Sequence, residues 1–270
     1  MCTTGMLRLG DDDYILFKNK DFGRAHFDDR LVVESEVFGV EGITTWAGSA
    51  PELDRFSGFS IGANEDGLLC CDSNVRTLED HASYDDLVEI ALTEGTDVAS
   101  AVGAVRRAVA TRPYSWGNLM MVDSSSQAAV EVRGQQVVVV QADGPTARTN
   151  HHTKLGVHPD DDDRTTTEKR LASAQRCVEA ASSLADVLTL LETHDDGDTG
   201  ICNHALYETV YSYVLHHQRG TTTLYVSQGH PCEKPQRLEL ALPLGKGWSP
   251  AAEVRFRAAY PSEHSTIPTA

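Results

Sequence analysis

The sequence has little positive charge and no long apolar run. It carries 23 Lys and Arg against 40 Asp and Glu, a formal net charge of −17, and only six of these bases are lysines. Because nucleic-acid binding requires a basic surface, we do not expect this chain to bind nucleic acid. It lacks any run of about eighteen apolar residues, so we expect no membrane-spanning helix. It also lacks a basic region followed by an apolar stretch at its N-terminus, so no signal peptide is predicted.

The acid excess favours a protein that works in concentrated salt. At an ionic strength of 1 M the Debye length falls to about 3 Å, which makes strong self-repulsion tolerable. We therefore interpret the chain as adapted to a salt-rich cytoplasm such as that of halophilic archaea. An ordinary acidic cytoplasmic protein is the alternative. The cysteines show no disulfide-framework spacing, which also favours a reducing cytoplasm; they are Cys2, Cys70, Cys71, Cys177, Cys202 and Cys232.

Hydrophobic periodicity predicts five groups of elements along the chain: strands, a pair of helices, strands, a second pair of helices, and strands again. Helices are expected over 85–110, with a break at Gly95, and over 165–181 and 183–192. A segment at 206–217 is mixed, and 250–270 reads as an irregular tail. No repeat or low-complexity linker divides the chain, so one domain over 1–270 is expected. The predicted strands are 2–9, 14–19, 31–40, 43–46, 59–61, 67–71, 118–123, 128–133, 136–141, 147–150, 222–227 and 237–242.

The N-terminal stretch Met1-Cys2-Thr3-Thr4 carries the strongest chemical signal. Removal of Met1 would leave Cys2 with a thiol and a free α-amine on one residue. An α-amine titrates near pH 8, so a useful fraction is an unprotonated base at neutral pH. Such a residue can supply both a nucleophile and the base that activates it. Because a cysteine at this position usually has no function, the interpretation depends on other parts of the chain.

Five blocks in fixed order provide that support, and they extend from Cys2 to Cys232. Together they resemble the cysteine N-terminal nucleophile (Ntn) hydrolases, which include the choloylglycine hydrolases and, more closely, the isopenicillin N acyltransferase-like proteins. The blocks are Cys2-Thr3-Thr4 with Phe17-Lys18-Asn19-Lys20-Asp21; Gly62–Leu68 with Asp72-Ser73-Asn74; Gly117-Asn118 with Thr149-Asn150-His151; Thr166–Arg170; and Ile201–His204 with Gly229-His230-Pro231-Cys232.

The resemblance implies an α+β fold, a four-layer αββα sandwich with two stacked, mainly antiparallel sheets. It also implies that Cys2 is the nucleophile, that Lys18 stabilises its thiolate and that Asp21 orients its amine. Bile-salt hydrolases commonly have arginine where this chain has Lys18, and an ammonium does not reproduce the bidentate guanidinium fork.

The other three residues implied by the resemblance hold the transition state. The backbone N–H of Asn74 and the side chain of Asn150 would bind the oxyanion, and Arg170 would support the site electrostatically. The implied reaction is cleavage of a linear amide in a small acyl-amide substrate, through a thioester on Cys2. Water or a second amine then takes the acyl group, and an acyl-CoA-dependent amine acyltransferase is the alternative within this fold.

No cofactor or metal is expected, and self-association into a homo-oligomer is left open. Two other classes remain: a metal-binding protein and a non-catalytic protein of the same fold. Cys202 with His204, or His230 with Cys232, could supply metal ligands, but isolated pairs are weaker signals than the two matched pairs of most zinc sites. The presence of all the implied site residues argues against a non-catalytic protein.

Overall fold

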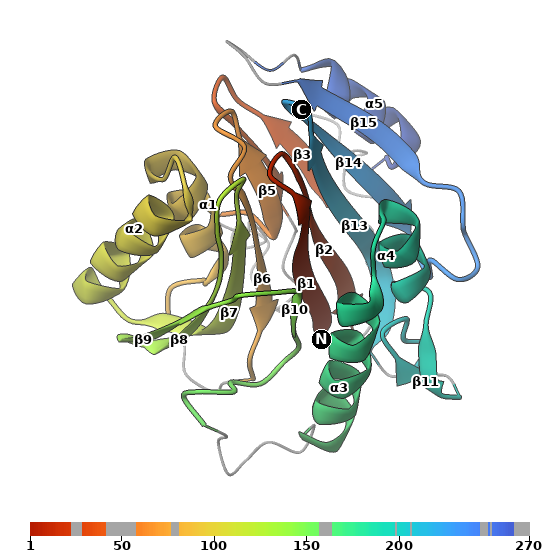
Figure 1. Cartoon of the computed structure of the whole chain (residues 1–270), viewed down its shortest axis with the longest axis horizontal. Coiled ribbons are helices and arrows are strands. Elements are labelled where there is room, and N and C mark those ends of the chain that lie inside the picture. The colour runs from red at the N-terminus through yellow and green to blue at the C-terminus, as the bar shows by residue number, and fades with distance from the viewer. Residues whose placement is uncertain are drawn as a thin grey trace, which may run out of the picture.

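Two antiparallel sheets form the centre of the computed structural model, which describes residues 1–22, 29–41, 58–76, 81–156, 164–197, 199–205, 207–243, 248 and 250–261 (Figure 1). The first sheet has the order β10-β1-β2-β13-β14-β15. Its central strands are formed by the two ends of the chain, so the N-terminal residues are surrounded by the rest of the fold. The strands are β1 (Cys2–Gly10), β2 (Asp13–Phe22), β10 (Thr146–Arg148), β13 (Glu208–Gln218), β14 (Thr221–Gln228) and β15 (Leu238–Pro243).

The second sheet is built from the middle of the chain in the sequential order β3-β4-β5-β6-β7-β8-β9. A separate two-stranded ribbon pairs β11 (His194–Asp196) with β12 (Thr199–Gly200). The predicted strand at 43–46 lies outside the described residues. The strands of the second sheet are β3 (Arg30–Val33), β4 (Val37–Glu41), β5 (Ile61–Asn64), β6 (Leu69–Asn74), β7 (Tyr114–Val122), β8 (Gln127–Gly134) and β9 (Gln136–Gln141).

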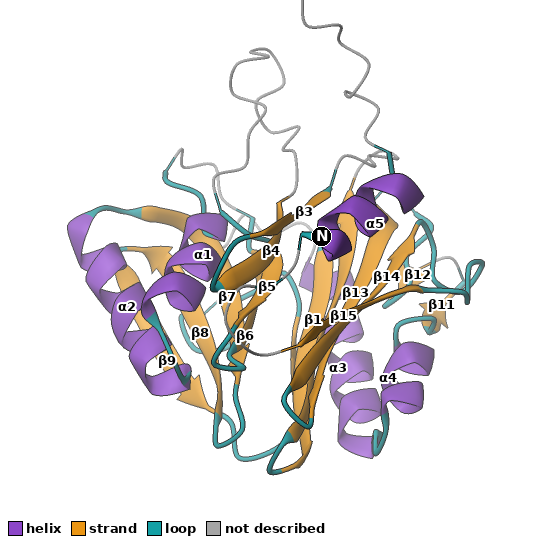
Figure 2. Cartoon of the chain, turned by 90° about the horizontal axis from the view of Figure 1, so that it is seen from above, coloured by secondary structure: helices purple, strands orange, loops and turns teal. Residues whose placement is uncertain are grey.

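Two pairs of helices cover the outer faces of the sheets (Figure 2). Helices α1 (Asp85–Glu94) and α2 (Val98–Thr111) bury their apolar faces against the second sheet. Helices α3 (Arg164–Ala180) and α4 (Leu184–Leu190) cover the first sheet. The layers therefore run helix, sheet, sheet, helix, and the predicted αββα sandwich is confirmed. None of the described helices is long and apolar enough to cross a lipid bilayer.

Side-chain alternation along the first hairpin determines which residues enter the space between the sheets. Met6 on β1 and Leu16 on β2 belong to the core between the sheets, whereas Leu7 and Phe17 belong to the core under α3 and α4. Because successive strand residues face opposite sides, Cys2 falls on the face of Met6, toward the second sheet. The hairpin therefore presents its first cysteine to the interior.

Two sequence expectations require correction. From Glu208 onward the mixed segment predicted at 206–217 is part of β13. The residues of this strand are almost continuously buried, so they show no alternation of apolar and polar residues that would have predicted a strand. The expected irregular tail at 250–270 contains a helix, α5 (Ala251–Ala259). Ala252 and Phe256, four residues apart, are buried in the core between the sheets. This tertiary contact stabilises a helix in a segment whose prolines and serines suggested a loop.

Candidate active site at the N-terminus

Cys2 begins β1, opposite Lys20 of β2, and only 6% of its surface is exposed. Its N–H donates to Oδ1 of Asn150 over 2.8 Å. Met1 extends the hairpin ladder by one residue: its α-amine donates to the carbonyl of Asp21, and its own carbonyl accepts from the N–H of Asp21, both over 2.7 Å. The peptide nitrogen of Cys2 is therefore held in a fixed, largely dry position.

Asn150 connects three separate parts of the chain. Its side-chain oxygen accepts from the N–H of Cys2 and from Nη2 of Arg170, each over 2.8 Å. Its side-chain nitrogen donates to the carbonyl of Asn74, the last residue of β6, over 2.7 Å. The two predicted oxyanion residues, which are 76 positions apart, thus lie side by side near Cys2. Because an amide NH₂ has two donors, Asn150 retains a second one beyond its bond to Asn74.

Arg170 reaches the N-terminus from helix α3 and is 97% buried. Its Nη1 donates to the carbonyl of Cys2 over 3.0 Å and to Oγ1 of Thr3 over 3.2 Å. Its Nη2 donates to Asn150, and the guanidinium lies 3.7 Å from Oδ2 of Asp21. A fixed contact with several acceptors is what a planar guanidinium provides better than an ammonium. Arg170 therefore fixes the first strand relative to Asn150.

Asp21 closes the hairpin beside Met1 and is almost fully buried. Burial raises the pKa of this carboxyl to about 6, opposed by the N-terminal amine, by Arg170 and by a hydrogen bond from Thr209. The Thr209 hydroxyl donates to Oδ1 over 2.7 Å. Within the described residues, Oδ2 is buried and accepts no hydrogen bond. This carboxylate can therefore still accept a donor at the N-terminus.

Lys18 lies between the sheets with its ammonium surrounded by oxygens of the second sheet. Its Nζ donates to the carbonyl and hydroxyl of Ser60, over 3.1 and 2.6 Å, and to Oδ1 of Asp72 over 3.0 Å. Burial alone would lower the pKa of Lys18, but the charges of Asp72 and Cys2 outweigh it, so the pKa is raised. The ammonium is therefore charged, and it acts electrostatically on the Cys2 thiol.

Sequence reasoning missed the acids that accompany Lys18. Asp85, the first residue of α1, is buried, and its pKa is raised by burial and by the neighbouring carboxylate of Asp72. Ser83 donates to Asp85 over 2.7 Å. A signal for this arrangement exists in the sequence, because a lysine in the middle of a buried strand requires a carboxylate partner. The sequence does not indicate which acidic residue supplies this carboxylate.

A second group of reactive side chains lies at the ribbon of β11 and β12 and at the turn after β14. His194, Cys202, His204 and Cys232 have ligand atoms that all lie within 4.8 Å of one another. Among the described residues, this group joins the pair Cys202 and His204 to Cys232 of the second pair, and it adds His194, which had no recognisable motif. These four residues could hold a metal ion, and His204, His230 and Glu233 form a second, overlapping group of possible ligands.

Comparison with known proteins supports the fold. No protein-family model and no curated protein matches the sequence. Among solved structures, a mutant conjugated bile acid hydrolase from Clostridium perfringens has a TM-score of 0.56 and 13% identity, covering 92% of this chain and 96% of that one. A second variant of that hydrolase gives a TM-score of 0.52 at 12% identity, over 92% and 98% of the chains.

A third similar structure is a Caenorhabditis elegans ortholog of an N-acylethanolamine-hydrolyzing acid amidase. Its TM-score is 0.54 and its identity is 11%, over 79% of this chain and 92% of that one. At such low identities the likeness establishes the fold and leaves the chemistry to be argued from the residues. The chain has the Ntn-hydrolase fold.

Proposed function

We propose that this protein is an N-terminal-cysteine amidohydrolase that cleaves a linear amide through a thioester on Cys2. One observation carries the proposal. The N–H of Cys2 donates a hydrogen bond to the side-chain oxygen of Asn150, and the side-chain nitrogen of Asn150 donates to the carbonyl of Asn74. A nucleophile and two prospective oxyanion donors thus lie within one connected group of hydrogen bonds. Amide cleavage through a covalent acyl-enzyme uses this combination.

The proposed reaction begins with removal of Met1, which frees the α-amine of Cys2. That amine takes the thiol proton as the sulfur attacks the substrate carbonyl. The negative oxygen accepts hydrogen bonds from the backbone N–H of Asn74 and the second amide hydrogen of Asn150. Collapse of the adduct breaks the C–N bond, and the α-ammonium protonates the departing amine. Water then attacks the thioester with the α-amine as base, which releases the acid and restores the thiol.

Three charged residues prepare this chemistry. The charged ammonium of Lys18 would stabilise negative charge that develops on the sulfur of Cys2. Asp21 supplies a buried carboxylate that can hold the new α-ammonium, since its Oδ2 has no hydrogen bond from the described residues. Arg170 positions Asn150 and the carbonyl of Cys2. The first two roles stabilise charges that the reaction creates, and the third positions a donor to the oxyanion.

The decisive experiment is intact-mass spectrometry of the purified protein in high salt, before and after mixing with a panel of acyl amides and thioesters. We expect a mass lacking Met1 and, with a slowly hydrolysed compound, a gain of one acyl group on Cys2. Added amines that divert the acyl group from water would reveal acyl transfer. The Cys2→Ala variant should fold normally and lose both acylation and turnover.

A matched control comes from Cys177, a half-buried cysteine on α3 outside the site. The Cys177→Ala variant should be acylated like the native protein. The Cys2→Ser variant should react more slowly, because a hydroxyl is far less acidic than a thiol. Turnover that survives in Cys2→Ala, or full activity with Met1 retained, would refute the mechanism.

A further inference from the structure

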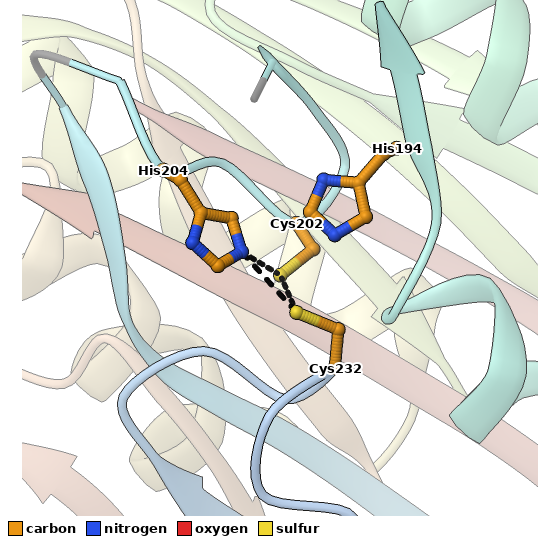
Figure 3. Close-up of side chains that lie close together, drawn as sticks. All are labelled: His194, Cys202, His204 and Cys232. Carbon is orange, nitrogen blue, oxygen red and sulfur yellow. Dashed lines mark hydrogen bonds between the residues drawn. The ribbon is translucent and has the colours of Figure 1, made fainter. Parts of the chain in front are cut away.

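A compact group of two cysteines and two histidines comes from three places in the chain: β11, the segment after β12 and the turn after β14. His194 begins β11, Cys202 and His204 follow β12, and Cys232 lies in the turn after β14. Figure 3 shows the sulfur atoms of the two cysteines and a ring nitrogen of His204 directed toward one another, with His194 beside Cys202. Cys202 is buried, His204 and Cys232 are half-buried, and His194 is exposed at the rim.

The distances within this group match those of a metal centre. Nε2 of His204 lies 3.2 Å from Sγ of Cys232 and 3.7 Å from Sγ of Cys202, and the two sulfurs are 3.5 Å apart. A tetrahedral zinc ion with Zn–S near 2.3 Å and Zn–N near 2.0–2.1 Å separates its ligand atoms by about 3.3–3.8 Å. These three ligands thus already have close to the spacing that zinc imposes.

The surroundings of His204 also fit a ligand. Its second ring nitrogen, Nδ1, lies 3.7 Å from a carboxylate oxygen of Glu233, within ion-pair distance. Its ring stacks on His230 with centroids 3.7 Å apart. A metal-bound histidine typically directs its other nitrogen to a carboxylate or carbonyl, which fixes the ring and raises its basicity. The ring of His204 is therefore oriented with Nε2 toward the two sulfurs.

We propose that Cys202, His204, Cys232 and His194 form a structural Zn²⁺ site. Binding displaces one proton from each thiol, and the two thiolates neutralise the charge of the ion. Four protein ligands fill the tetrahedron and leave no position for water or substrate, so the site is structural. The proposal does not depend on the amidase activity, because the ligands are distinct from the six candidate active-site residues.

The site would hold the loop that supports Asp21. Asn203, between two of the ligands, donates its N–H to Oγ1 of Thr209 over 2.9 Å, and its carbonyl accepts from the N–H of Thr209 over 2.7 Å. The Thr209 hydroxyl in turn donates to Asp21. A metal that fixes Cys202 and His204 therefore fixes, through Asn203, the donor that lowers the pKa of Asp21.

Metal analysis of the full-length protein tests the proposal. The protein is purified under reducing conditions without chelator, and zinc is measured by elemental mass spectrometry. We expect one zinc per chain. After removal by a chelator, added Co²⁺ should give the visible absorption of a tetrahedral, thiolate-bound ion, and added Zn²⁺ should raise the unfolding temperature, because it binds the folded state.

Variants distinguish this site from adventitious binding. Cys232→Ser, at a half-buried position, should weaken zinc binding by more than about 100-fold, since even outer-shell partners contribute about 10–100-fold. His194→Ala, at the exposed rim, should weaken it while leaving the fold intact. Cys177→Ser is the matched control and should bind zinc like the native protein.

Three results would overturn the proposal. The first is folded, reduced native protein that contains no zinc and gives no tetrahedral cobalt spectrum. The second is a Cys232→Ser variant that binds zinc as tightly as Cys177→Ser. The third is a Cys202–Cys232 disulfide in protein taken directly from cells, detected by peptide mapping, because a disulfide removes both thiolate ligands.

Discussion

The ammonium of Lys18 lies 3.0 Å from a carboxylate oxygen of Asp72, and the side chains of both are at least 97% buried. The two residues come from different sheets, so this ion pair joins the sheets beside the nucleophile. A buried pair contributes little net stability when intact, but removal of one partner leaves an uncompensated charge. Lys18 is therefore both a structural contact and a buried cation that interacts electrostatically with Cys2.

Replacement of Lys18 tests its contribution to stability and its effect on the reactivity of the Cys2 thiol. Lys18→Met should destabilise the fold by about 3–5 kcal/mol, because Asp72 is left buried without its cation. The rate at which iodoacetamide alkylates Cys2 should also fall, since the ammonium no longer favours the thiolate. Equilibrium unfolding and mass-resolved alkylation measure the two quantities.

The double variant Lys18→Met/Asp72→Leu provides the control. It should recover much of the stability, because no buried charge remains unpaired, but alkylation of Cys2 should stay slow. Fast alkylation in the double variant would show that Lys18 does not act on the thiol.

Substitution of Arg170 tests how Asn150 is positioned. Arg170→Lys keeps the charge but cannot reproduce donors to Cys2, Thr3 and Asn150 at once. We expect kcat for amide cleavage to fall by about 10- to 100-fold, equivalent to about 1.4–2.7 kcal/mol of transition-state stabilisation, with KM little changed. Arg176→Lys, at an exposed position on the same helix, is the control and should leave both constants unchanged. Equal losses in the two variants would contradict this role.

The raised pKa of Asp21 predicts how activity and stability depend on pH. Activity that needs an ionised Asp21 should rise as the pH passes about 6. Since the folded-state pKa lies above the unfolded value of about 3.9, the folded protein binds more protons between these values. The contribution of this group to stability is therefore greatest below about pH 4 and decreases as the pH rises toward 6.

Thr209→Val tests this assignment, because it removes the hydroxyl that donates to Asp21. Loss of that hydrogen bond should raise the pKa of Asp21, so the rise in activity should shift toward higher pH by up to about one unit. Thr223→Val on β14 is a control that should not change the pH at which activity rises. An activity profile that is identical in native and Thr209→Val proteins would remove Asp21 as the titrating group.

The first hairpin and the helix pair α1–α2 could be predicted because their signals are local. The turn-rich residues Gly10–Asp13 mark the hairpin between the strands at 2–9 and 14–19, and Gly95 marks the break between the helices. The candidate site could be named because its residues fall in ordered blocks. The structure brings Cys2, Asn150 and Arg170 into direct contact, and their catalytic roles remain predictions for the experiments above.

The remaining features depend on contacts between distant segments. The partner of Lys18 is 54 positions away, and no pattern near Lys18 indicates Asp72. His194 lies eight residues before Cys202, and Cys232 thirty residues after it, so the metal-ligand group has no compact motif. β13 and α5 are likewise determined by burial against other elements. In each case tertiary packing supplies what local sequence does not.

Helix α5 was not predicted from the sequence, and loss of its packing against the core should lower the stability of the protein. Phe256 is 1% exposed within the core between the sheets, and its ring meets that of Tyr260 edge-on, with centroids 5.4 Å apart. Phe256→Ala should lower the free energy of unfolding by about 3–5 kcal/mol through lost burial and the cavity left behind. Val254→Ala, at a position 66% exposed on the same helix, should change it by less than about 0.5 kcal/mol. Equilibrium unfolding in high salt compares the two variants, and equal stabilities would show that α5 does not belong to the core.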